Sequence, residues 1–290
     1  MCQLIVHGGA GKIRSSQLYR EGLEESLRRG YGALEKEGAL EGVIAAVLSL
    51  EANPLFNCGT GSALNLDGEV EMDASVMTSE ERFGAVGSLK RVEHPILIAR
   101  RVMEETDHLL IVGDGAERLA RYWGYPLYDP VVESRQNELE DVKRKGSAFL
   151  PNLRRFLVEE AKGTVGAVAR DRSGFIAVAT STGGYAAKLP GRIGDSAILG
   201  AGTYASRWGG ASATGHGEQI WRKLLCFEAV EGMRNDPAGR VIPRLVREAK
   251  EQGCSCGLIG IDWRGRLSQA FNTEAMLWGS IEDGQWTLNA

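Results

Sequence analysis

The sequence lacks the features that mark several specialised classes of protein. No apolar run reaches the ~18 residues that a membrane-spanning helix needs, so no membrane partner is expected. The 34 basic and 38 acidic residues give a net charge of −4, and no basic block could follow a row of phosphates. Nucleic acid is therefore not an expected partner either. The first residues show no basic segment followed by an apolar one, which predicts a cytoplasmic location.

Cysteine is scarce and scattered along the chain. The five cysteines are odd in number, which fits reduced thiols better than a disulfide framework. Hydrophobic residues make up 43 % of the chain, which is too many for a disordered protein. A chain of 290 residues buries roughly three quarters of its unfolded surface, so it needs no cross-links to fold.

Glycine is the residue in excess. There are 38 glycines in 290 residues, about 13 % where ~7 % is usual, and they follow no collagen-like period. Such an excess indicates many turns, or positions where the backbone must approach another group without a side chain between them.

Hydrophobic periodicity predicts hairpins and paired helices. Strands are expected over 3–7 and 109–112, and hairpins over 62–76 (turning at Asp67-Gly68), 164–180 and 257–271. Helices are expected from Ser15 or Ser16 to Gly38, and over 40–51, 95–105, 115–123, 214–231 and 243–252. This order favours an α+β fold with antiparallel sheets covered by helices over the βαβ alternation of a parallel sheet.

Residues 125–163 differ in composition from the rest of the chain. Charged residues crowd together, glycine almost vanishes, and periodicity fades apart from one helical stretch over 149–160. We interpret this segment as a charged connector between two halves of the chain.

The common catalytic motifs have the wrong context here. Gly253-Cys-Ser-Cys-Gly257 matches the G-x-S-x-G pattern of α/β-hydrolases, but a helix is expected before Ser255 where that motif needs a strand. The four histidines form no H-E-x-x-H motif, and Cys254-x-Cys256 has no second pair, so no catalytic metal is expected.

Four short motifs follow the connector, and their order is more informative than any one of them. They are Gly163-Thr164, Thr180-Ser-Thr-Gly-Gly184, Gly191-Arg-Ile-Gly-Asp195 and Ala213-Thr-Gly-His-Gly217. Three more precede them: Val6-His-Gly-Gly-Ala-Gly11, Asn53-Pro-Leu-Phe-Asn-Cys-Gly-Thr-Gly61 and Glu71-Met-Asp-Ala-Ser-Val-Met77. In this order the chain resembles, over most of its length, the isoaspartyl peptidase and plant-type L-asparaginase family of N-terminal nucleophile hydrolases. The resemblance implies a four-layer αββα sandwich of two antiparallel sheets flanked by helices.

The resemblance also implies that the precursor cuts itself between Gly163 and Thr164. One domain over 1–290 would then contain an α chain, 1–163, with the connector 125–163 at its end, and a β chain, 164–290. The freed Thr164 nitrogen would be an α-amine with a pKa near ~8, able to act as base for the hydroxyl of the same residue.

Other site residues are carried over from the resemblance. Thr182 is expected beside the nucleophile and Asn57 near the scissile bond. Substrate binding is expected from Arg192, Ile193, Gly194, Asp195, Thr214, Gly215, His216 and Gly217. Within this set Arg192 suits an α-carboxylate and Asp195 an α-ammonium group, while the Thr214 hydroxyl and the Gly215 N–H would receive an oxyanion.

No cofactor is implied by the resemblance. The corresponding loop of the family often holds a structural sodium ion, here near Leu50, Glu51, Asn53 and Phe56. The expected working unit is a homodimer of cleaved protomers acting on small molecules. The chain departs from the family at Tyr185-Ala-Ala-Lys188, because relatives have an asparagine before the lysine.

The leading hypothesis is an amidohydrolase that cleaves β-aspartyl dipeptides and L-asparagine through a β-aspartyl ester on Thr164 and releases L-aspartate. Two alternatives stay open. One is a glycosylasparaginase-type enzyme, and the other is an uncleaved, inactive relative that only binds aspartyl ligands.

Overall fold

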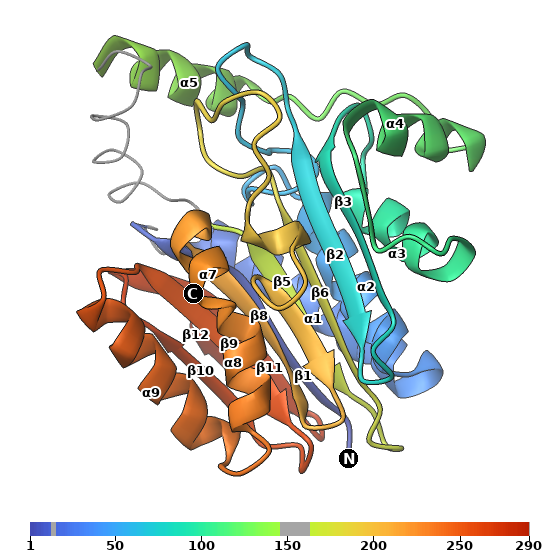
Figure 1. The fold of residues 1–290 in the computed structure, drawn as a ribbon, viewed down its shortest axis with the longest axis vertical. Coiled ribbons are helices and arrows are strands. Elements are labelled where there is room, and N and C mark those ends of the chain that lie inside the picture. The colour runs from blue at the N-terminus through green and yellow to red at the C-terminus, as the bar shows by residue number, and fades with distance from the viewer. Residues whose placement is uncertain (13–15, 146–162, 290) are drawn as a thin grey trace.

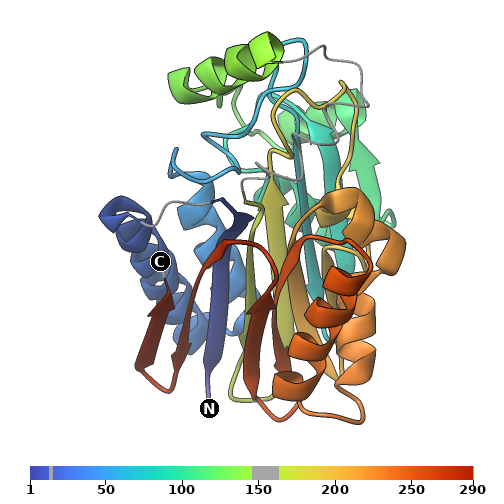
Figure 2. The same cartoon turned by 90° about the vertical axis from the view of Figure 1, so that its left-hand side faces the viewer.

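Two β-sheets lie face to face, and helices cover the outer side of each (Figures 1 and 2). This arrangement is seen in a computed structural model that describes residues 1–12, 16–145 and 163–289. The four layers confirm the αββα sandwich expected from the resemblance.

The larger sheet combines strands from both sides of the connector. Its order is β12 (Gln285–Asn289), β11 (Ala275–Glu282), β1 (Gln3–Gly11), β5 (Val165–Arg170), β6 (Ile176–Thr182), β2 (Met72–Thr78), β3 (Phe83–Leu89) and β4 (Leu110–Val112). Neighbouring strands are antiparallel except for β3 and β4. β1 lies between β11 and β5, and its register with β5 sets His7 opposite Gly166.

The smaller sheet comes entirely from the second half of the chain and is antiparallel. Its order is β10 (Leu267–Phe271), β9 (Cys256–Asp262), β8 (Gly209–Gly215) and β7 (Thr203–Ser206).

The helices divide between the two outer faces. The larger sheet carries α1 (Gln17–Glu37), α2 (Ala39–Glu51), α3 (Pro95–Glu105) and α4 (Gly113–Tyr122), and the smaller sheet carries α8 (Leu225–Gly232) and α9 (Ala238–Glu251). Three further segments complete the fold: α5 (Glu133–Lys145), the 3-10 turn η1 (Asp195–Ala197) and α7 (Gly217–Lys223). Ser16 caps α1, because its Oγ accepts a hydrogen bond from the Tyr19 N–H at 3.4 Å.

The central strands are buried on both faces. On β1, Leu4 and Val6 pack under the helices, whereas Ile5 points between the two sheets. On β5, Ala167 packs under the helices and Val168 points between the two sheets. Because successive side chains of a strand point to opposite faces and both faces are covered, most side chains of these strands are apolar or small and the sequence shows little alternation.

A chain of buried polar side chains also crosses between the sheets. The Ser75 hydroxyl donates to Thr203 at 2.8 Å, and Thr203 donates to Thr180 at 2.6 Å. Ser212 Oγ then lies 2.8 Å from Thr180 Oγ1 and 2.9 Å from His7 Nε2. All five side chains are fully buried, so their hydrogen-bond partners must be other protein groups. Ser75 Oγ also lies 2.5 Å from the Ser196 carbonyl oxygen.

Several predicted elements are confirmed. These are the helices over 40–51 and 95–105, the hairpins over 164–180 and 257–271, and the short strand near 109–112. The predicted helix over 149–160 lies outside the described residues.

The predicted helix over 214–231 is wrong at both its start and its middle. Thr214 and Gly215 belong to β8, where Thr214 pairs with Gly257 of β9. The helical part is split into α7 and α8 at Leu224, whose φ of +47° is left-handed and cannot continue a helix.

The predicted hairpin over 62–76 is confirmed only next to its turn, where Leu64 and Val70 form an isolated antiparallel bridge. A tight turn does form at Gly68, closed by Asn65 Oδ1, which accepts from the N–H groups of Asp67 and Glu69. β2 begins after this turn and pairs with β3 and β6 instead.

Two glycines of α1 provide a test of the packing between α1 and α2. A Cβ on Gly30 would lie 2.8 Å from Ala46 Cβ and 2.9 Å from Leu4 Cδ2, so Gly30→Ala should destabilise the protein by about 1–3 kcal/mol. A Cβ on Gly32 would meet nothing within 4 Å, so Gly32→Ala should stabilise it by about 0.5–1 kcal/mol through helix propensity. Melting temperatures of the two variants should therefore shift in opposite directions, and a shift in the same direction would contradict this packing.

Candidate active site

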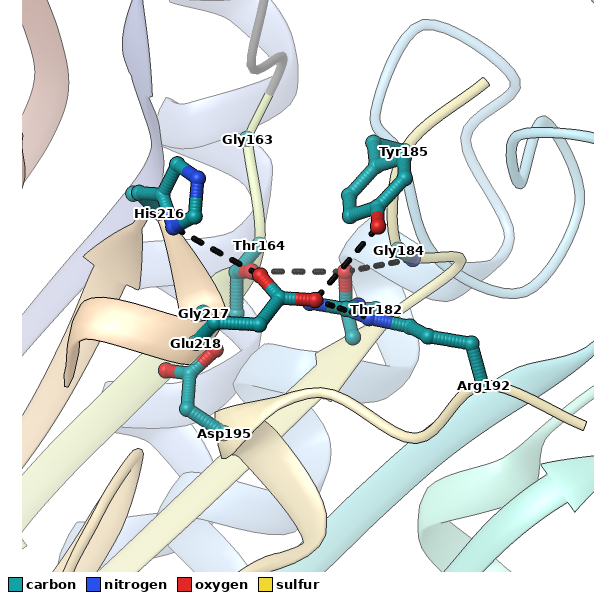
Figure 3. Close-up of a pocket in the computed structure, with 11 residues that line it drawn as sticks. Gly163, Thr164, Thr182, Gly184, Tyr185, Arg192, Asp195, His216, Gly217 and Glu218 are labelled. Carbon is teal, nitrogen blue, oxygen red and sulfur yellow. Dashed lines mark hydrogen bonds and ion pairs between the residues drawn. The ribbon is translucent and has the colours of Figure 1, made fainter. Parts of the chain in front are cut away.

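Thr164 lies directly before β5, at one end of the larger sheet. The residue is only 8 % exposed, and its hydroxyl donates to the Thr182 hydroxyl oxygen at 3.3 Å (Figure 3). Thr182 is the last residue of β6, the strand beside β5, and its oxygen also accepts from the Gly184 N–H at 3.0 Å. The pairing of β5 with β6 thus brings the two threonine hydroxyls together.

Gly163, the residue before Thr164, packs backbone against backbone on Gly9. A Cβ on Gly9 would lie 2.1 Å from Gly163 Cα, and a Cβ on Gly163 would lie 2.7 Å from Gly9 Cα. Both residues have positive φ, +113° and +38°. No side chain fits at either position, so the peptide bond between Gly163 and Thr164 is held against the end of β1.

A pocket opens beside these two residues. Its lining residues are Gly163, Thr164, Thr182, Gly184, Tyr185, Arg192, Asp195, Gly215, His216, Gly217 and Glu218 (Figure 3). They come from three separate parts of the second half of the chain: the strands β5 and β6, the segment that leads into η1, and the junction of β8 with α7.

Arg192 and Asp195 face the same small space in this pocket. A Cβ placed on Gly217 would lie 2.6 Å from Arg192 Nη2 and 2.8 Å from Asp195 Oδ1. Asp195 Oδ2 is buried and accepts no hydrogen bond from any described residue. A cation and an anion that converge on one point suit a small ligand carrying both a carboxylate and an ammonium group.

Burial controls the ionisation of Asp195. Desolvation raises the pKa of this carboxyl from 3.8 to about 7, although the nearby Arg192 guanidinium partly opposes the shift. The site therefore contains a carboxylate that is costly to ionise until a cation binds beside it.

Two acidic residues of the β2 region hold the backbone of the Arg192 segment. The Gly191 N–H donates to the Glu71 carboxylate at 3.0 Å, and the Gly194 N–H donates to Asp73 Oδ2 at 2.8 Å. Lys188, fully buried, donates from Nζ to the Glu71 carbonyl at 2.5 Å, and burial lowers its pKa to about 8. Arg192 and Asp195 are thus presented by a segment tied down on both sides.

Comparison with known sequences agrees with this geometry. The profile of the family described as Asparaginase matches residues 1–288. The chain belongs to this family. It is 41 % identical over 300 residues to the plant-type L-asparaginase of Pyrococcus furiosus, covering 98 % of this chain and 97 % of the relative. It is 40 % identical over 302 residues to the isoaspartyl peptidase of Salmonella typhimurium, covering 97 % and 96 %. It is 37 % identical over 292 residues to the isoaspartyl peptidase/L-asparaginase of Danio rerio, covering 97 % and 93 %.

Eight of the residues expected from the family resemblance line the pocket. They are Gly163, Thr164, Thr182, Arg192, Asp195, Gly215, His216 and Gly217. The motifs that were separate in the sequence are therefore neighbours in this asparaginase-family fold.

Four other expected residues lie behind the pocket wall. Ile193 packs its side chain against Gly87, and the Gly194 backbone is bound to Asp73 as described above. The Thr214 hydroxyl oxygen accepts from the Ala10 N–H at 3.3 Å. Their expected contact with substrate stays a prediction.

Asn57 is the fourth of these residues. Its side-chain N–H donates to the Gly184 carbonyl at 2.5 Å, and its Oδ1 accepts from the Ala63 N–H at 2.8 Å. These contacts hold the turn after Thr182, and the expected place of Asn57 near the scissile bond stays a prediction.

Tyr185 and Glu218 line the pocket although neither was among the expected site residues. Each directly follows a family motif, Tyr185 after Gly184 and Glu218 after Gly217. Their position at the edge of the motifs was the signal in the sequence that could have identified them.

The described residues contain neither a membrane-spanning helix nor a cluster of metal-ligating side chains. No helix among them is long and apolar enough to cross a membrane. Within the same residues, no group of three or more His, Cys, Asp or Glu side chains is placed to hold a metal ion.

The raised pKa of Asp195 predicts a pH-dependent effect of Asp195→Asn on stability. The folded protein retains a proton that the unfolded chain has already released at its lower pKa, so wild-type stability is lost as pH rises from about 4 through 7. The amide has no charge to desolvate. Asp195→Asn should therefore raise the free energy of unfolding, relative to the wild type, by about 2–3 kcal/mol more at pH 8 than at pH 5.

Urea unfolding at the two pH values measures this difference. Both proteins should carry Thr164→Ala, which removes the expected cut and leaves one chain to unfold. An equal gain at pH 5 and pH 8 would show that Asp195 is ionised without cost in the folded protein.

Proposed function

We propose that the protein is an amidohydrolase, activated by its own cleavage, that hydrolyses L-asparagine and β-aspartyl dipeptides. The observation that carries the proposal is the position of Thr164, a hydroxyl at the start of a buried strand beside converging Arg192 and Asp195 side chains. The names of the relatives, plant-type L-asparaginase and isoaspartyl peptidase, support the same two substrate classes.

Maturation would begin with attack of the Thr164 hydroxyl on the Gly163 carbonyl carbon. The acyl group moves from nitrogen to oxygen, and water then hydrolyses the ester to leave chains 1–163 and 164–290. The two chains would stay together as one domain, because β1 pairs with β5 and β11 across the cut. The crowded glycine contact at Gly9 supports this step by keeping side chains away from the bond.

The freed α-amine of Thr164 would then act as general base for its own hydroxyl. The hydroxyl oxygen attacks the side-chain carbonyl of the substrate, and the leaving amine takes the proton. A β-aspartyl ester on Thr164 results, and water hydrolyses it to L-aspartate. Thr182 supports the nucleophile through its hydroxyl contact.

The tetrahedral intermediate would place its oxyanion at the end of β8. The Gly215 N–H and the Thr214 hydroxyl are the proposed donors, of which Gly215 lies in the pocket wall. The substrate head group would bind with its α-carboxylate on Arg192 and its α-ammonium on Asp195, next to Gly217.

A structural sodium ion is compatible with the loop that follows α2. The carbonyl oxygens of Leu50, Asn53 and Glu51 accept hydrogen bonds from the N–H groups of Asn53, Phe56 and Thr60, and each keeps a second lone pair. The Glu51 carboxylate faces other groups, since its Oε1 accepts from Ser181 at 2.6 Å and its Oε2 lies 3.3 Å from His94 Nδ1, so the carbonyl oxygens are the better ligands. The ion would hold this loop and take no part in the reaction.

The assembly and location follow the family resemblance. We propose a homodimer of cleaved protomers in the cytoplasm. The location is supported by the five cysteines, which are all free and buried. Light scattering on the purified protein measures the assembly directly.

Thr164→Ala should abolish both cleavage and hydrolysis. Intact mass should show two chains for the wild type and one 290-residue chain for the variant. Ammonia release from asparagine should fall at least ~1,000-fold, because nucleophile and base are lost together. Thr164→Ser keeps both groups and should retain cleavage with reduced activity.

Three results would overturn parts of this proposal. Hydrolysis by Thr164→Ala would exclude Thr164 as nucleophile. A wild-type chain that stays uncut and releases no ammonia would favour the inactive aspartyl-binding relative. A preference for glycosylated asparagine over asparagine would favour the glycosylasparaginase alternative.

Gly217→Ala tests the head-group site separately from the nucleophile. The new Cβ would lie under 3 Å from both Arg192 and Asp195, so KM for asparagine should rise at least ~10-fold while the cut at Gly163 is retained. Gly239→Ala on α9 is a matched control, since a Cβ there meets nothing within 4 Å. Equal kinetics for both variants would exclude this site.

A further inference from the structure

The Glu218 carboxylate extends across the pocket between Arg192 and His216 (Figure 3). Arg192 Nε donates to Glu218 Oε1 at 2.9 Å, and the Tyr185 hydroxyl donates to the same oxygen at 3.4 Å. The other oxygen, Oε2, lies 3.5 Å from His216 Nδ1. Glu218 therefore contacts three other residues of the pocket wall, and neither the motifs nor the proposed reaction accounts for it.

These contacts restrain the Arg192 guanidinium on two sides. Glu218 binds its Nε edge, and the Tyr185 ring lies against its face, with the guanidinium carbon 4.5 Å from the ring centroid. The two Nη nitrogens point elsewhere. Nη1 lies 2.7 Å from the position of a Cβ on Gly194, and Nη2 lies 2.6 Å from one on Gly217, the point that Asp195 also faces.

The charges of Glu218 and Arg192 also support the arrangement in which Glu218 binds the Nε edge of the guanidinium and leaves the two Nη groups to a ligand. Burial raises the pKa of Glu218, but Arg192, a backbone N–H and His216 together outweigh this effect, so the net shift of the pKa is downward and Glu218 is ionised at neutral pH. The Arg192 side chain is 13 % exposed, and a guanidinium this buried needs a counter-charge. Glu218 supplies that charge without using the Nη groups, of which Nη2 faces the point shared with Asp195 and Nη1 lies beside Gly194 and Gly184.

Resting on the function proposed above, we infer that Glu218 is a positioning residue that, with Tyr185, orients Arg192 so that its two Nη groups bind the substrate α-carboxylate. Glu218 thereby makes the site selective for ligands with a free α-carboxylate. The opposite role is an internal competitor that occupies Arg192 until substrate displaces it. The geometry favours positioning, because Glu218 takes the Nε edge and leaves the paired Nη edge to the ligand.

Inhibition by two product analogues distinguishes these roles. L-Aspartate carries the α-carboxylate, and its α-amide replaces that group with a neutral one. In Glu218→Ala, the inhibition constant for L-aspartate and KM for asparagine should rise about 10-fold or more, the usual effect of losing a hydrogen bond to a charged group. The inhibition constant for the α-amide and kcat should change less than about 3-fold.

Glu218→Gln provides the conservative comparison. Its side-chain oxygen can still accept a hydrogen bond from Arg192 Nε. KM of this variant for asparagine should therefore lie between the KM of the wild type and that of Glu218→Ala. Glu228→Gln, an exposed glutamate on α8, is the matched control and should leave all constants unchanged. Normal cutting at Gly163 shows that each variant is folded, because that step needs no carboxylate ligand.

The outcomes separate this inference from the proposed function. A lower KM in the Glu218 variants would identify a competitor and overturn positioning. Equal changes for L-aspartate and its α-amide, or none for either, would also overturn it while leaving the hydrolase intact. An inactive, uncut wild type would instead overturn the proposed function, and this inference with it.

Discussion

The contact between the backbones of Gly163 and Gly9 is the constraint on which the rest of the site depends. Each residue occupies the space that a side chain on the other would need. The contact sets the start of β5 against the end of β1, and the pairing of β5 with β6 then places Thr164 beside Thr182. Glycine is needed at both positions because only a bare backbone can approach this closely.

The charged groups around the pocket are organised at a cost in stability. Asp195 is buried with one oxygen that accepts no hydrogen bond from the described residues, and burial raises its pKa. Glu71 and Asp73 bind the backbone that carries Arg192 and Asp195, so part of the buried charge is used to hold the site rigid. Such a preformed site is typical of proteins that sacrifice stability for ligand recognition.

Elements with a strong local signal in the sequence were predicted correctly. The helix over 40–51 is apolar on one side, and the hairpin over 164–180 turns at Asp171-Arg-Ser-Gly174. β8 was partly assigned to a helix because its sequence, Gly-Gly-Ala-Ser-Ala-Thr-Gly, has small residues on both faces and no alternation. Its strand conformation is decided by pairing with β7 and β9, which are distant in the sequence.

By itself, the sequence determined which chemical groups are present and where the chain can turn. The Gly163-Thr164 pair, the Arg192 and Asp195 side chains and the cap of α1 at Ser16 all follow from local residue chemistry. Only the tertiary structure decided that Glu218 reaches Arg192 and that Asn57 binds the carbonyl of Gly184. These contacts join segments that meet only through sheet pairing and sheet packing, and periodicity in a sequence reports neighbours along one element alone.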